Sequence, residues 1–491
     1  MPHQLKLRLQ AALMSGTLLL AQIAAADSGD TAVQLPDMGE SINRFMTANE
    51  EQQLGAAFMR NVRRTLTVMD DPQINRYIQS LGQRLATYST QPQQKFHFFV
   101  IDDPAINAFA GPGGYIGINS GLILAARYED ELAAVIAHEL AHVTQHHLAR
   151  AYENTSEMSL PMTAAIIAAI ILGNQPGLGQ LSEATLVGAT AGSLQHQINF
   201  TRSNEQEADR IGSQTLARAG YASDAMQRFF TRLLQNNQYQ EDAALEFLRT
   251  HPLTINRIAG SSNLPLASST PSNDGGNNSN PSYFSLIQHR IRVLVSNDQM
   301  RLDAYYEHLE SDNDATRYGK ALAAVYNHRY QEAGESLADL TKRSPDNLNF
   351  ALAAIENEVI NGTPERALAL INAKLHLYPD DPPLTVFYVQ ALLRNAEYAQ
   401  ARNVLRQYMH KVSAGPQLYA LLAEVEGKYG DVSATHQALA EYYFLNGDSE
   451  GALRQIDLAL KQGQSLADND RARLESRRRE IKQIIDSEPQ H

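Results

Sequence analysis

The chain has 491 residues, which is too long for one ordinary hydrophobic core and long enough for two or three domains. Hydrophobic residues make up 43% of the chain and charged residues 19%, a composition that argues against an intrinsically disordered protein. The net charge of −13 argues against a general nucleic-acid-binding protein, because neutralising phosphates requires clustered Lys and Arg.

Residues 1–26 have the features of a secretory signal peptide. Two basic residues precede an apolar stretch at residues 11–23, and Ala24 and Ala26 are the small residues of a cleavage site. The alternative is a membrane anchor, but a span needs about 20 apolar residues and this stretch is shorter. We therefore expect cleavage near Ala26 and export. The absence of cysteine excludes disulfides and lipid attachment at a cysteine.

Residues 27–259 predict one mixed domain. Helical periodicity near residues 48–88 is followed by an aromatic and β-branched run at 96–101 and a glycine-punctuated stretch at 115–119, both typical of strands. A further helix is predicted over residues 130–152, with one stripe of apolar residues spaced three and four apart. The members of this stripe are Leu132, Ile136, Leu140 and Val143.

Residues 158–198 are unusually small and apolar. The longest uncharged apolar run, residues 160–172, is too short to span a bilayer as a helix. One interpretation is a pair of buried helices joined near residues 173–179. The other is a mobile flap, or a helix that makes peripheral contact with a membrane or touches a non-native substrate.

Residues 260–282 are dominated by Ser, Asn, Gly and Pro, which predicts a flexible linker and a domain boundary. Residues 283–491 are helical in pattern, and Ala333, Ala367 and Ala401 recur in similar contexts at steps of 34 residues. A helix-turn-helix period of 34 residues indicates tetratricopeptide repeats, which stack into an α-solenoid with a concave binding surface. The alternative is a helical domain without repeats.

The segment HELAH at residues 138–142 is a candidate metal site. His138 and His142 are four residues apart on a predicted helix, so their imidazoles can converge on one ion. Glu139 lies beside them, where it can act as a general base; this is the H-E-x-x-H pattern of zinc peptidases. The alternative is an ordinary helix that carries two surface histidines.

A third metal ligand must come from another segment, because catalytic zinc usually has three protein ligands and one open position. Glu205 and Asp209 are four residues apart on a second predicted helix. Glu205 is a plausible ligand, and Asp209 is placed to orient a ligating histidine. Glu207 is expected to point away from Glu205, and the alternative for all three acids is a solvated helix face.

Two more histidines follow on the first predicted helix. His147 lies 180° from His138 around the helix, so we expect it to face elsewhere. His146 continues the four-residue step, but it lies about 9 Å beyond the level of residue 140 along the helix axis. Its imidazole is therefore too far from a metal that the first two histidines hold.

Four segments together resemble peptidase family M48 of zinc metallopeptidases: residues 107–123, 133–147, 204–212 and 250–258. They agree with the family's motifs in order as well as in content. The resemblance implies a mainly α fold, in which a gluzincin-type metallopeptidase domain with a small β-sheet precedes the α-solenoid of tetratricopeptide repeats.

The resemblance also implies roles for individual residues. One zinc ion per chain would be held by His138, His142 and Glu205, with Glu139 as the base and Asp209 as the supporting acid. The family places an edge strand beside the cleft, and residues 113–119 match that strand here. An extended polypeptide substrate adds to such a strand through its backbone, which permits loose sequence specificity.

His251, in the segment THPLTINR, is a candidate for a further role at the site. It is expected either to stabilise the oxyanion of the reaction or to act as a fourth zinc ligand that holds the enzyme latent. The third possibility is a packing or capping histidine before Pro252. Arg257 matches a trailing arginine of the family, without an assigned role.

The leading functional hypothesis is a periplasmic zinc endopeptidase with chaperone-like activity. The resemblance implies that it degrades misfolded or stalled outer-membrane proteins and promotes their assembly, with the outer-membrane assembly machinery as partner. The alternative is mainly a repeat-based assembly chaperone or scaffold with latent protease activity. No nucleic-acid partner is expected.

Overall fold

The computed structural model describes residues 47–151, 160–172, 202–236, 251, 282–309, 312–462 and 467–487. All of them except residue 47 belong to one compact unit, Ala48–His491. The predicted signal peptide, Arg257 and nearly all of the predicted linker lie outside the described residues.

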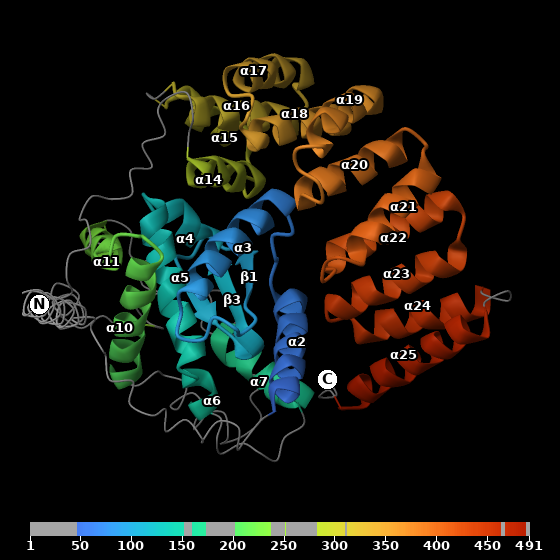
Figure 1. The fold of residues 1–491 in the computed structure, drawn as a ribbon, viewed down its shortest axis with the longest axis horizontal. Helices are drawn as coiled ribbons and strands as arrows, with labels where there is room; N and C mark the ends of the chain where they lie inside the picture. The colour runs from blue at the N-terminus through green and yellow to red at the C-terminus, as the bar shows by residue number, and fades with distance from the viewer. Residues whose placement is uncertain are drawn as a thin grey trace, which may run out of the picture. The chain divides into compact units, whose positions relative to one another are not determined.

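The structure is mainly helical with one small sheet, which confirms the predicted fold class (Figure 1). The helices before the predicted linker are α2 (Ala48–Thr65), α3 (Pro72–Thr87), α4 (Ser120–Ala125), α5 (Glu129–Thr144), α6 (His147–Ala151), α7 (Leu160–Leu172), α10 (Arg202–Arg218) and α11 (Ala225–Asn236). The strands are β1 (His97–Ile101), β2 (Ala108–Ala110) and β3 (Tyr115–Asn119).

The sheet has the strand order β1-β3-β2, with β1 parallel and β2 antiparallel to β3. The prediction that residues 113–119 form an edge strand is therefore wrong, because β3 is paired on both sides. The cause is the turn at Gly113 and Gly114, whose φ angles of 68° and 76° reverse the chain so that β2 pairs back onto β3. The edge strand on this side of the sheet is β2.

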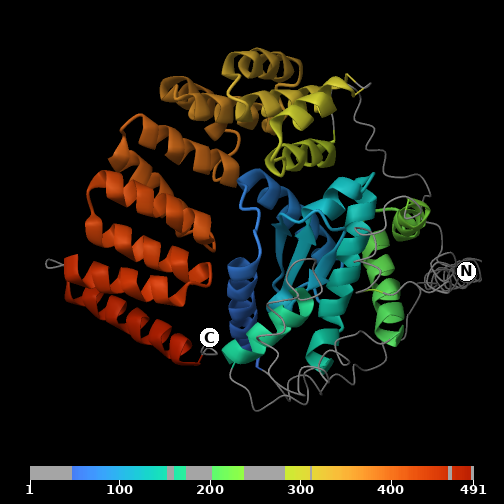
Figure 2. The ribbon, with the colours of Figure 1, turned by 180° about the vertical axis from the view of Figure 1, so that it is seen from behind.

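Helix α5 runs through the centre of the domain, between the sheet and α10 (Figure 2). The predicted apolar stripe lies in the main hydrophobic core, with Leu132, Ile136, Leu140 and Val143 all buried. The opposite face is also covered, because Ala141 packs against Ala208 of α10. A helix buried on both sides holds its side chains in fixed positions, which is what a metal site requires.

Helix α7 is the first of the two apolar helices predicted in residues 158–198. Its Ala164 and Ile167 are buried, and the helix packs along α2. The second predicted helix lies outside the described residues. None of the described helices combines the length and the apolar character needed to cross a membrane.

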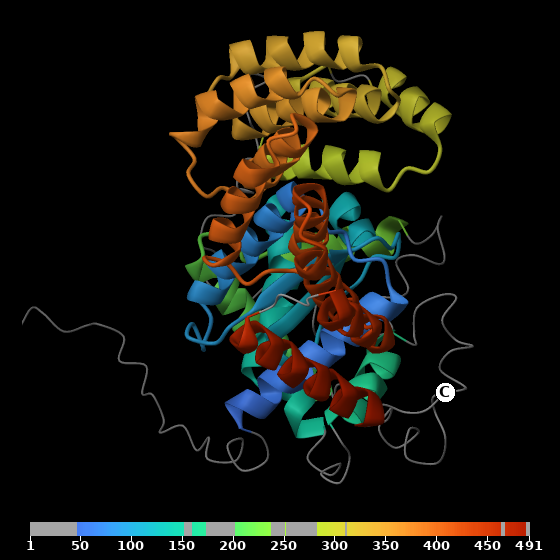
Figure 3. The ribbon, with the colours of Figure 1, turned by 90° about the vertical axis from the view of Figure 1, so that its right-hand side faces the viewer.

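The second part of the chain is a series of helices in which each packs against the next, as a solenoid requires (Figure 3). Ala333, Ala367 and Ala401 each occupy the fourth position of α17, α19 and α21, and all three are fully buried. Small residues recur there because neighbouring helices approach closely. The helices are α14 (Tyr283–Leu294), α15 (Gln299–Glu307), α16 (Asp314–Tyr326), α17 (Tyr330–Arg343), α18 (Leu348–Asn361), α19 (Pro364–Leu375), α20 (Pro382–Arg394), α21 (Tyr398–Met409), α22 (Pro416–Tyr429), α23 (Val432–Leu445), α24 (Ser449–Gln462) and α25 (Asp468–Ser487).

Helix α14 connects the two parts through a buried arginine. Arg290 is 1% exposed and pairs with two carboxylates, Asp71 at the start of α3 and Glu356 in α18. Tyr326 donates a further hydrogen bond to Glu356. The guanidinium thus joins the sheet-containing domain to the first repeats.

Candidate metal centre

Helix α5 brings His138 and His142 together, one helical turn apart. Both side chains are buried, and their Nε2 atoms are 3.0 Å apart. The predicted convergence of the two imidazoles is confirmed. Glu139 is the next residue along the helix and is equally buried.

Glu205 reaches the same point from α10. Its carboxylate oxygens lie 3.5 Å from His138 Nε2 and 3.4 Å from His142 Nε2. The approach of the two helices depends on small residues: a Cβ at Gly212 would lie only 3.0 Å from the carbonyl oxygen of Ala137. The segment expected to supply the third donor therefore does so geometrically.

His251 joins this group from a different part of the chain. Its Nδ1 lies 3.2 Å from Glu205 Oε1 and 3.4 Å from His138 Nε2. Its Nε2 lies 3.5 Å from Glu139 Oε1. One ligand atom from each of His138, His142, Glu205 and His251 lies within 4.8 Å of the others, and all four residues are buried. Three imidazoles and a carboxylate, shielded from solvent, form a donor set that fits a divalent transition metal.

The charges of these groups depend on each other. Burial alone would raise the pKa of Glu205, but His251 and His138 hold it well below its ordinary value. Burial would lower the pKa of His138, but hydrogen bonds with Asp209 and Glu205 raise it to about 10. An ionised carboxylate is thus fixed among imidazole nitrogens in a low-dielectric interior, where it attracts a cation strongly.

The remaining ring nitrogens have partners of their own. His138 Nδ1 lies 3.1 Å from Asp209 Oδ1, which is the contact expected of an acid that orients this histidine. His142 Nδ1 lies 3.0 Å from Nδ1 of His147, which is itself buried. The prediction that His147 faces elsewhere is therefore wrong.

The error has a physical cause. The predicted helix 130–152 is interrupted: α5 ends at Thr144, and His146 has a left-handed φ of 55° before α6 begins at His147. The bend turns His147 back toward α5. Glu207 points away from the four-residue cluster, as predicted, but its carboxylate lies 3.1 Å from His147 Nε2 rather than on a purely solvated face.

Glu139 lies against the edge strand β2. Burial raises its pKa, and the backbone of Ala110 forms a hydrogen bond with its carboxylate. In the antiparallel register, Ala108 and Ala110 are non-hydrogen-bonded positions relative to β3, so their backbone groups point to the open edge. On that edge the Ala108 N–H donates to the Asn107 side chain, and the described residues provide no further strand.

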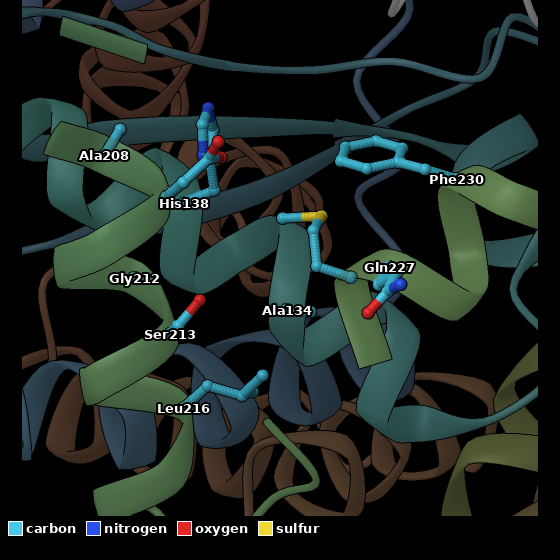
Figure 4. Close-up of a pocket in the computed structure, with 10 residues that line it drawn as sticks. Ala134, His138, Ala208, Gly212, Ser213, Leu216, Gln227 and Phe230 are labelled. Atoms are coloured by element: carbon cyan, nitrogen blue, oxygen red, sulfur yellow. The ribbon is translucent and has the colours of Figure 1, made fainter. Parts of the chain in front are cut away.

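An open pocket of about 420 Å³ lies behind His138, between α5, α10 and α11 (Figure 4). It exposes Asp209, whose side chain is 25% exposed, while His138 is 1% exposed. The pocket does not reach Glu139, so it is distinct from the edge of β2. Its lining consists of Ala134, His138, Ala208, Asp209, Gly212, Ser213, Leu216, Met226, Gln227 and Phe230.

Comparison with known proteins identifies the family. The profile of peptidase family M48 matches residues 72–263, and that of a tetratricopeptide repeat matches residues 359–425. The chain is 34% identical to a putative β-barrel assembly-enhancing protease of Vibrio cholerae, over 89% of this chain and 91% of that protein. The chain belongs to peptidase family M48.

Two further relatives extend this result. The M48 chain is 31% identical to the β-barrel assembly-enhancing protease of Escherichia coli, over 98% of both proteins. It is 33% identical to the mitochondrial metalloendopeptidase OMA1 of Schizosaccharomyces pombe, over 37% of this chain and 50% of that protein. This M48 protein is therefore a metallopeptidase, and the His138, His142, Glu205 and His251 cluster is where it can bind its metal.

Proposed function

We propose that this protein is a periplasmic zinc endopeptidase that cleaves misfolded or stalled outer-membrane proteins and promotes their assembly. The observation that carries the proposal is the buried convergence of His138, His142 and Glu205 beside the carboxylate of Glu139. The relatives named as β-barrel assembly-enhancing proteases support the choice of substrate and compartment.

In this proposal His138 and His142 hold one zinc ion through Nε2, and Glu205 holds it through its carboxylate. Bound zinc supplies a Lewis acid that polarises the peptide carbonyl and makes water acidic. Glu139 accepts the proton of the attacking water and passes it to the departing amine nitrogen, so that hydroxide is added to the carbonyl carbon and the C–N bond breaks. Its raised pKa suits a group that both accepts and donates a proton near neutral pH.

We place the substrate along β2. The outward backbone groups of Ala108 and Ala110 are available to an extended chain, and Ala110 lies directly beside Glu139. Pairing through the backbone selects extended, unfolded segments rather than a particular sequence. This property suits an enzyme that acts on outer-membrane proteins before they fold.

His251 is proposed as a fourth ligand that keeps the enzyme latent. Its Nδ1, rather than its Nε2, faces Glu205 and His138, which supports coordination over the oxyanion role. A fourth protein ligand would occupy the position that the reacting water needs. We expect His251→Ala to retain zinc and to cleave an unfolded substrate faster than wild type; slower cleavage would instead support the oxyanion role.

The proposed function is tested with the purified full chain and a urea-unfolded outer-membrane β-barrel protein. We expect cleavage by wild type or His251→Ala, loss of cleavage in Glu139→Gln, and inhibition by a zinc chelator. Cleavage that is the same in Glu139→Gln as in its parent would contradict the proposal. N-terminal sequencing of protein from the periplasmic fraction tests export and cleavage near Ala26.

The alternative function is that of an assembly chaperone with latent protease activity, and the intact helical array favours a binding role beside catalysis. In a strain that lacks the gene, Glu139→Gln distinguishes the two. If the inactive variant restores assembly of outer-membrane proteins fully, binding is the main function. If it does not, proteolysis is required.

A further inference from the structure

A chain of three side chains leads away from the metal cluster through His142. His142 Nδ1 lies 3.0 Å from His147 Nδ1, and His147 Nε2 lies 3.1 Å from Glu207 Oε2. The His147 side chain is 0% exposed, whereas Glu207 is 34% exposed on α10. The chain therefore connects a buried ring to a carboxylate at the surface.

The backbone is shaped to make this contact. In an uninterrupted helix His147 would lie about 140° from His142 around the axis and would not touch it. The turn after α5 places His146 at a φ of 55°, and its amide donates to the carbonyl oxygen of Val143. Gln91 holds the outside of the turn, where its amide donates to the Thr144 carbonyl and contacts His146 Nε2.

The proton positions follow from the geometry. His142 directs Nε2 into the cluster, so its Nδ1 carries the hydrogen and donates it. His147 must then accept at Nδ1, which leaves its hydrogen on Nε2, where it is donated to Glu207. His138 has the same arrangement with Asp209, except that the carboxylate is reached directly.

We propose that His147 and Glu207 are positioning residues that fix the ring of His142 for metal binding and thereby set the metal affinity of the site. The inference rests on the proposed metal site. Partners of ligating histidines orient the ring and increase its basicity, and their loss typically costs about 10- to 100-fold in metal affinity. A buried histidine that only filled space would leave two polar nitrogens to be satisfied, and an apolar side chain would serve better.

The test measures the zinc dissociation constant of the full chain by competition with a chromophoric chelator. His147→Leu removes the acceptor, and we expect a roughly 10- to 100-fold weaker affinity. His147→Asn keeps an acceptor oxygen near the position of Nδ1, and we expect it to recover most of the loss. Glu207→Ala, a change at a partly exposed position, is expected to weaken affinity in the same direction by a smaller factor. His146→Asn is the matched control, because it stays in the same turn without contacting a proposed ligand, and its affinity is expected to equal that of wild type.

Two further measurements separate positioning from folding. The metal-free variants are expected to unfold at the same temperature as the His146→Asn control, within a few degrees. In the cobalt-substituted protein, the visible absorption bands are expected to shift in His147→Leu and to return in His147→Asn, which a merely structural role would not produce.

An affinity of His147→Leu within twofold of wild type would overturn the inference, as would a loss that His147→Asn does not reduce. These results leave the proposed function intact if the wild-type protein binds zinc. Failure of wild type to bind zinc would instead refute the proposed function together with this inference.

Discussion

Replacement of Arg290 tests how the two parts of the chain are joined. Its guanidinium nitrogens lie 2.5 Å from Asp71 Oδ2 and 2.7 Å from Glu356 Oε2. Arg290→Met keeps much of the side-chain volume but leaves both carboxylates without their cation. Breaking a buried ion pair in this way costs about 3–5 kcal/mol. Asp71 retains its hydrogen bonds from the backbone amides at the start of α3, so we expect the total to stay in this range and to come mainly from Glu356.

The assay is urea unfolding followed by circular dichroism at 222 nm, because the chain has no tryptophan for fluorescence. The matched control is Arg317→Met, which removes an exposed ion pair with Asp312 and is expected to cost less than about 1 kcal/mol. Adding Asp71→Asn and Glu356→Gln to Arg290→Met is expected to recover part of the loss. A cost for Arg290→Met no larger than that of the control would refute the reasoning.

Three further predictions concern the helix contact, acid stability and the array. Gly212→Val places new atoms against the α5 backbone at residue 137, so it should push α10 and Glu205 away and weaken zinc binding at least about tenfold in the chelator competition. Burial and Arg292 lower the pKa of His289 to about 4, so the folded state keeps it neutral while the unfolded chain takes up a proton. Folding stability should therefore fall by about 3 kcal/mol through this group as the pH drops from 6.5 to 4, and His289→Asn should lack that part of the loss in urea titrations at several pH values. Ala367→Leu overpacks a fully buried position and should cost about 1–3 kcal/mol without changing zinc affinity; an unchanged urea midpoint would contradict close helix packing there.

Features with a local signature were predictable from the sequence. His138 and His142 on one helix face follow from their spacing, as does the shared face of Glu205 and Asp209. Ala367 marks a repeat because helix pairs leave room for a small residue at a fixed step. In each case the periodicity of the helix converts sequence distance directly into spatial distance.

Features that depend on a single turn or on distant partners were not predictable in this way. Strand β2 has only three residues, too few for a periodic signal, so β3 was assigned the edge that β2 occupies. His146 is not a residue that usually marks a left-handed turn, so the return of His147 to the cluster was missed. Arg290 is 219 residues from Asp71, a separation that no local pattern reveals.

The metal content of the purified full chain tests the central claim most directly. By elemental analysis we expect one zinc per chain in wild type and in Glu139→Gln, because Glu139 is proposed as the base and not as a ligand. We expect His142→Ala to lose most of its zinc. Wild-type protein that contains no zinc after purification, and whose peptidase activity is indifferent to a chelator, would contradict the claim.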